Sequence, residues 1–183
     1  MKQRIKSYSL KFTKEIIPVI AGILIALFIN NWYNESKDRA YIKQIFTTIK
    51  SELNESRQDL NLNLPRLDSF KDAINIHLEN EEHRLLDLVV NNGGIYVASI
   101  KLNAWNAVST SKIDLIDYNI INSLSNVVEQ KEILTFKSNY LMNFLYANFH
   151  ATDKETKEIL LVLIDDIIWT EKEIIRIIDE IDY

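Results

Sequence analysis

An unbroken apolar run, Ile16–Ile29, constrains this chain more than any other feature. As a helix its fourteen residues rise only about 21 Å, which is short of a hydrocarbon core of about 30 Å. A helix that begins near Leu10 and ends near Tyr33 would be about 36 Å long. The run alone is therefore compatible with a membrane anchor, a cleaved signal peptide or a buried core helix.

The flanks of the apolar run favour an uncleaved anchor. Trp32 and Tyr33 follow the run at the depth where aromatic side chains mark a membrane interface. Lys11 and Lys14 precede it, and their long stems can extend toward water. The residues after the run offer no small-x-small cleavage site. We therefore expect a single-pass anchor over residues 15–34, with the bilayer as the first partner of the chain.

The distribution of basic residues predicts the orientation of this anchor. Five Lys and Arg residues precede the run and four follow it within the window that the positive-inside rule counts. A short basic N-terminus also favours retention on the cytoplasmic side. We expect residues 1–14 to form a basic cytoplasmic head and residues 35–183 to form an extracytoplasmic domain.

Composition predicts that the domain after the anchor is helical. The chain has only three Gly and two Pro, too few for a turn-rich sheet fold. It has no Cys, which excludes a disulfide framework, and its net charge of −5 argues against nucleic acid as a partner. We expect an all-α fold in which the transmembrane helix continues into an extramembrane antiparallel helical bundle.

Apolar periodicity outlines the helices of this bundle. One stripe leads from the anchor to Leu64, where Pro65 should break or kink the helix. A second helix is expected over 66–90, with an interruption at the polar Asn-Glu-Glu-His of 80–83 as an alternative. A turn should follow at the Asn-Asn-Gly-Gly of 91–94, and then a short helix within 95–108. A long helix should cover 118–149, and Thr152 with Glu155 suggests a capping box before the last helix.

The last helix carries two parallel apolar stripes. The first forms a heptad seam through Leu160, Leu163, Ile167, Thr170, Ile174, Ile177 and Ile181. The second runs beside it through Leu161, Ile164, Ile168, Ile175 and Ile178. Two stripes require contact over most of the helix, either inside the bundle or with a partner or second copy. Asp165 and Asp166 interrupt the run and argue against a second membrane span.

The anchor also contains a candidate association motif. Gly22 and Ala26 lie four residues apart, a small-xxx-small pair that allows two transmembrane helices to approach closely. Asn30 and Asn31 at the outer end can add hydrogen bonds between helices, or can simply lie among the lipid headgroups. The alternative is an anchor that contacts only lipid.

No sequence pattern predicts catalysis or a cofactor. The three histidines, His77, His83 and His150, include no i, i+4 pair typical of a zinc helix. Glycine patterns for phosphate or dinucleotide binding and the Gly-x-Ser-x-Gly motif of serine hydrolases do not occur. We therefore expect neither a catalytic nor a metal site, and we do not expect an enzyme.

The anchor resembles the N-terminal signature of a known family. The similarity rests on Glu15-Ile16-Ile17, Gly22–Leu27, Ile29–Trp32 and Asn34-Glu35, and more weakly on Trp105, Asp114–Asp117 and Leu124-Ser125. The chain departs from the signature at Lys14, Phe28 and Tyr33. The family comprises uncharacterised single-pass inner-membrane proteins common in Bacteroidetes. The resemblance implies a bacterial inner-membrane anchor with a periplasmic helical domain, and it implies no activity.

Two functions fit these features. The first is a membrane-anchored interaction or scaffold protein of the cell envelope, which associates with itself or acts as an accessory subunit of a membrane complex. The second is an extracytoplasmic helical bundle that senses a small ligand between its helices and signals laterally to a partner. We favour the interaction protein, because the head before the anchor is too short for an output domain.

Overall fold

The computed structural model describes residues 2–181 and, for residues 2–13, the helical backbone alone. Over this range the chain is all-α, with no strand, which confirms the predicted fold class at this level. The elements are α1 (Lys2–Ile76), α2 (Leu85–Asn91), α3 (Asn103–Ser109), the 3₁₀ turn η1 (Ile113–Leu115), α4 (Tyr118–Asn148) and α5 (Lys154–Glu180). The chain divides into two compact units, Met1–Gln44 and Ile45–Tyr183.

The predicted break at Pro65 is wrong, because α1 stays helical through this residue. A proline inside a helix costs about 3 kcal/mol through a lost hydrogen bond and a steric clash. Here Pro65 itself is exposed, while Leu60, Leu67 and Ile74 on either side of it are almost fully buried. The burial of these side chains within the second unit outweighs the local cost, so tertiary packing overrides the sequence signal.

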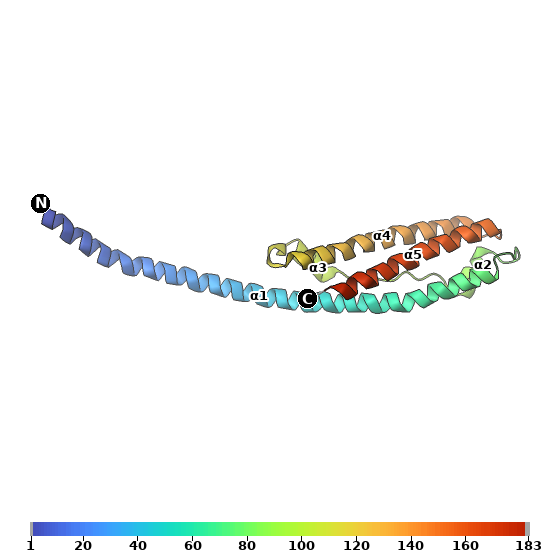
Figure 1. Cartoon of the computed structure of the whole chain (residues 1–183), viewed down its shortest axis with the longest axis horizontal. Helices are drawn as coiled ribbons and strands as arrows, with labels where there is room; N and C mark the ends of the chain where they lie inside the picture. Colours follow the sequence, from blue (N-terminus) through green and yellow to red (C-terminus); the bar gives the residue numbers. More distant parts are fainter. Residues whose placement is uncertain (1, 182–183) are drawn as a thin grey trace. The chain divides into compact units, whose positions relative to one another are not determined.

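Within the second unit, α5 packs antiparallel to the C-terminal part of α1. Polar contacts connect the two helices in reverse order along their lengths, pairing Arg57 with Asp179, Asn63 with Glu171 and Lys71 with Asp165. Just beyond the end of α1, Glu79 pairs with Lys154 at the start of α5. Figure 1 shows α4 alongside α5, so three long helices form the body of this unit. This is the antiparallel bundle that the sequence predicts.

Capping residues set the start of α4 and α5. The Asp117 side chain accepts a hydrogen bond from the Asn119 amide at the beginning of α4. At α5 the cap is Asp153, which accepts from the amide of Thr156 at 2.8 Å and from its hydroxyl at 2.9 Å. These bonds and the helix dipole stabilise the carboxylate and lower the pKa of Asp153. The expected cap at Thr152 is thus displaced by one residue.

The segment between α1 and α3 differs most from the sequence expectation. The interruption expected at 80–83 is present and is longer than those four residues, because α1 ends at Ile76 and α2 begins only at Leu85. The predicted turn after α2 is present, and Gly93 and Gly94 adopt φ angles of 80° and 85°, a region that side chains with a Cβ rarely enter. Residues 95–102 are then extended rather than helical.

Candidate functional site

The N-terminal apolar segment exposes its side chains in the structure. Every large apolar residue from Ile17 to Tyr33 is at least half exposed, and Phe28 reaches 73 %. Soluble proteins rarely expose contiguous apolar surface of this size. Among the described residues, the helix that carries this segment is the one element long and apolar enough to cross a membrane.

The residues predicted for association and anchoring lie on this exposed helix. Ala26, Asn30, Asn31, Trp32 and Tyr33 are all exposed, and so is Lys14. A Cβ added at Gly22 would meet no atom within 4 Å, so nothing in the described chain crowds that position. The side chain of Lys11 lies outside the described residues. The prediction that Gly22 and Ala26 mediate helix association therefore stays a prediction.

The predicted seam of α5 lies mostly in the core of the second unit. Leu160, Ile167 and Ile174 are at most 2 % exposed, and Ile177 and Ile181 are also buried. Leu163 is only half-buried. The neighbouring stripe contributes Ile164, Ile168 and Ile178 to the same core. Of the two interpretations of the seam, its burial fits packing inside the bundle.

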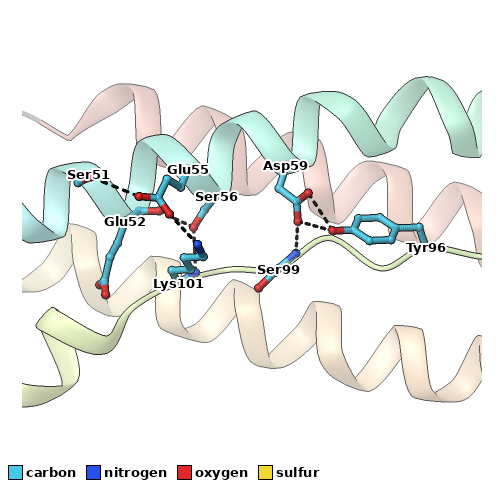
Figure 2. A network of polar contacts seen from close by, with 8 residues as sticks. All are labelled: Ser51, Glu52, Glu55, Ser56, Asp59, Tyr96, Ser99 and Lys101. Carbon is cyan, nitrogen blue, oxygen red and sulfur yellow. Dashed lines mark hydrogen bonds and ion pairs between the residues drawn. The ribbon is translucent and has the colours of Figure 1, made fainter.

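A polar column on α1 holds the extended segment 95–102, which we call the strap. Figure 2 shows Asp59 and Ser56 of α1 pointing at the strap backbone. Asp59 accepts from the Ser99 amide at 2.7 Å and Ser56 accepts from the Lys101 amide at 2.8 Å. One turn earlier on α1, Glu52 accepts from the Ala104 amide at 3.0 Å, at the start of α3. Side chains of α1 thus satisfy backbone donors that have no sheet partner.

Two further contacts fix the strap through its own side chains. The hydroxyl of Tyr96 donates to both carboxylate oxygens of Asp59 at 2.9 Å, which raises the pKa of Tyr96 because the phenolate would face a carboxylate. Lys101 forms an ion pair with Glu55 at 2.6 Å. This pairing lowers the pKa of Glu55 and raises that of Lys101, since each charge favours the other.

Sequence reasoning missed the strap, although α1 carries a signal for it. Polar residues Glu52, Ser56, Asp59 and Asn63 recur at steps of four, three and four directly beside the apolar stripe. Such spacing places them on one helix face. The apolar periodicity of α1 predicts the helix, whereas this second, polar periodicity indicates a segment bound along it.

The column ends at a buried polar pair. Nδ2 of Asn63 donates to Oε1 of Glu171 at 2.7 Å, and both residues are fully buried. Burial is the main cause that raises the pKa of Glu171 to about 7, and the Asp59 carboxylate adds to it. Hydrogen bonds from Asn63 and the Ala98 backbone act in the opposite direction. In the described chain, Oε2 of Glu171 and Oδ1 of Asn63 have no hydrogen-bond partner.

A buried lysine lies at the end of the bundle where α1 stops and α5 begins. Lys157 on α5 is fully buried, and its Nζ donates to the carbonyl oxygens of His77 at 2.9 Å and Asn80 at 2.7 Å. Both carbonyls follow the end of α1, where helical hydrogen bonding stops. Lys157 therefore contributes to structure at a helix end rather than forming part of a reactive site.

The structure offers no clustered metal ligands in its described part. Within residues 14–181, no group of three or more His, Asp or Glu side chains is placed to hold an ion. The rings of His77 and His83 do lie close together, with centroids 4.2 Å apart. This contact crosses the polar turn after α1, which linear spacing could not reveal.

Comparison of this chain with protein-family models, curated proteins and solved structures found no match. The functional assignment therefore depends on the exposed apolar helix and on the surfaces of the bundle. The family resemblance of the anchor remains a prediction.

Proposed function

We propose that this chain is a membrane-anchored helical interaction protein of the bacterial cell envelope. In this proposal residues 15–34 span the inner membrane and the helical unit forms a periplasmic platform. The chain associates with a second copy or serves as an accessory subunit of a membrane complex. The resemblance of the anchor to single-pass inner-membrane proteins is in line with this function.

One observation carries the proposal. The apolar side chains from Ile17 to Tyr33 stay at least half exposed, whereas the apolar stripes of the second unit are buried. In water this segment would expose a continuous apolar surface, which is unfavourable by about 25 cal/mol per Å². Insertion into lipid removes that surface from water without requiring a protein partner.

Fractionation tests the anchor directly. We expect the full-length protein in the membrane fraction after cell lysis, and we expect it to resist extraction by alkaline carbonate and to dissolve in mild detergent. Intact protein in the aqueous fraction, without detergent and without N-terminal trimming, would contradict the proposal.

A reporter fusion tests the proposed orientation separately. Alkaline phosphatase fused after Tyr183 should be active, because this enzyme requires an oxidising compartment, and a green fluorescent protein fusion should be dark after export through the general secretory pathway. The opposite pattern would place the bundle in the cytoplasm and leave the anchor itself intact.

A pocket in the second unit supports ligand sensing as a second candidate function. It measures about 350 Å³ and is lined by residues that include Asn63, Arg66, Phe70 and Gly94. Arg66 also lies 5.2 Å from the centre of the Tyr96 ring. A thermal shift screen of small carboxylates should stabilise the full-length protein in detergent if this pocket binds them. Unchanged melting with the whole set would reject this candidate.

A further inference from the structure

The outer surface of α4 and α5 exposes large apolar side chains outside the anchor. On α4 Phe136 is 73 % exposed and Tyr140 is 56 % exposed. On α5 Val162 is 66 % exposed and Trp169 is 62 % exposed. We call these four residues, together with Leu163, the aromatic face.

The aromatic face is one continuous surface. The spacings from Phe136 to Tyr140 and from Val162 to Trp169 are one and two helical turns, so each pair lies on a single helix face. Phe136, Tyr140 and Leu163 line one pocket of about 260 Å³ between the two helices. Figure 1 shows α4 and α5 side by side over this region. Apolar patches of this kind mark interaction sites.

The charges on the aromatic face compensate each other. Nζ of Lys137 lies 3.1 Å from Oδ1 of Asp166 and also donates to the hydroxyl of Thr170 at 3.1 Å. The same ammonium lies 5.6 Å from the centre of the Trp169 ring, within the range of a cation–π contact. The face is thus locally neutral, although the chain carries a net charge of −5.

We propose that the aromatic face docks onto the same face of a second copy of this chain. Two copies with a net negative charge repel each other, so they are best able to meet at a locally neutral surface. The face combines protruding side chains, Val162 and Trp169, with the pocket next to them. A two-fold contact is self-complementary, because the protruding side chains of each copy can fill the pocket of the other.

The exposed area of the aromatic face is about the size expected for the interface of a weak dimer. Its half-exposed side chains offer about 500 Å² per copy, or about 1,000 Å² in total, which is the lower limit for a specific interface. Such a contact becomes populated when a tether raises the effective concentration of the partner. In this respect the dimer rests on the proposed membrane anchor.

Cross-linking through introduced cysteines tests the proposal, because the native chain has none. We would express full-length Val162→Cys in its membrane and treat the membranes with a short bis-maleimide. The matched control is Leu62→Cys, which is 64 % exposed on α1, away from the aromatic face. We expect a cross-linked dimer from Val162→Cys at least tenfold above that from Leu62→Cys.

A second substitution tests the role of the side chains in the contact. Adding Trp169→Ala to Val162→Cys should lower the dimer yield at least tenfold, since aromatic side chains dominate the energy of such interfaces. Its circular dichroism spectrum should be unchanged, because Trp169 is largely exposed. Equal yields from Val162→Cys and Leu62→Cys would overturn the proposal, and so would a cross-linked product with the mass of a different protein.

Fractionation of the same samples separates this proposal from the anchor. Membrane-bound Val162→Cys that stays monomeric would refute the aromatic-face dimer and leave the anchor standing. Selective Val162→Cys dimers recovered from an aqueous fraction would support the face and refute the anchor.

Discussion

Asn63 on α1 and Glu171 on α5 are joined in the core by a hydrogen bond of 2.7 Å from Nδ2 to Oε1. Their other two side-chain oxygens are buried, and in the described residues neither has a hydrogen-bond partner. Both atoms are hydrogen-bond acceptors, and protonation of Glu171 would convert one of its carboxylate oxygens into a donor. The buried pair is therefore expected to bind a proton more tightly in the folded protein than in the unfolded chain.

This pair predicts a pH dependence of stability. Burial raises the pKa of Glu171 from its ordinary value of 4.5 to about 7. Its contribution to the free energy of unfolding is fully present below about pH 4.5 and is lost as pH rises toward 7. The loss amounts to about 3 kcal/mol over that interval. Denaturant unfolding of the full-length protein in detergent, followed by circular dichroism from pH 4 to 8, measures it.

The matched variants for this measurement are Glu171→Gln and Glu129→Gln. Glutamine keeps an acceptor and supplies a permanent donor, so Glu171→Gln should flatten the pH dependence between pH 5 and 7. Glu129 is exposed on α4, and its substitution should leave the slope unchanged. A slope that persists in Glu171→Gln would assign the pH dependence to groups other than Glu171.

Removing the carboxylate of Asp59 should loosen the strap. Asp59→Ala leaves the Ser99 amide and the Tyr96 hydroxyl without their acceptor, which we expect to cost about 1–3 kcal/mol. Hydrogen exchange of residues 95–102 should accelerate more than exchange in α4. The exposed Asp68 provides the control, since Asp68→Ala should leave exchange in the strap unchanged. Equal exchange in both variants would show that the strap is held without the Asp59 contacts.

The buried seam should respond to truncation far more than exposed apolar positions. Ile174 is fully buried, so Ile174→Ala should lower the free energy of unfolding by about 2–5 kcal/mol. Leu62 is 64 % exposed, and Leu62→Ala should change stability by about 0.5 kcal/mol at most. The denaturant concentration at the midpoint of unfolding measures the change in stability of each variant. A stable Ile174→Ala protein that merely lost a binding partner would instead indicate an intermolecular seam.

A bulky residue at Gly22 tests association through the anchor. No atom of the described chain lies within 4 Å of a Cβ at this position, so Gly22→Leu should leave the fold of a single copy intact. It should lower self-association in membranes if Gly22 and Ala26 form a close helix contact. Energy transfer between labelled copies in vesicles measures this, with Ala21→Leu as the neighbouring control. Unchanged transfer in Gly22→Leu would limit the segment to anchoring.

Long apolar periods made most of the fold predictable from the sequence. The stripes of α4 and α5 predicted both helices to within a few residues, because burial of one face determines such elements. The predicted helix break at Pro65 was wrong because the sequence shows the free-energy cost of a proline inside a helix. It does not show the packing of Leu60 and Leu67 that offsets this cost. The interruption after Ile76 was expected from the polar residues 80–83, but the contact between Lys157 and the carbonyl of His77 was not, since the two residues are 80 positions apart.

The candidate sites were less predictable than the fold. The apolar composition of the anchor is enough to predict its exposure. The aromatic face cannot be predicted in this way, because the sequence does not show which sides of α4 and α5 are covered by other helices. The strap depends on pairings between Asp59 and Ser99, which are 40 residues apart in sequence. The buried pair of Asn63 and Glu171 bridges 108 residues, a separation at which single-sequence patterns carry no pairing information.

The antiparallel packing of α1 against α5 has a consequence for biosynthesis. The apolar side of α1, with Leu60 and Ile74, leaves the ribosome well before its covering helix, and paired residues such as Lys71 and Asp165 are 94 positions apart. At about 5–20 residues per second, this face waits roughly 5–20 s for α5. During this interval the apolar face of α1 in the nascent chain is open to chaperones, to the membrane surface and to aggregation.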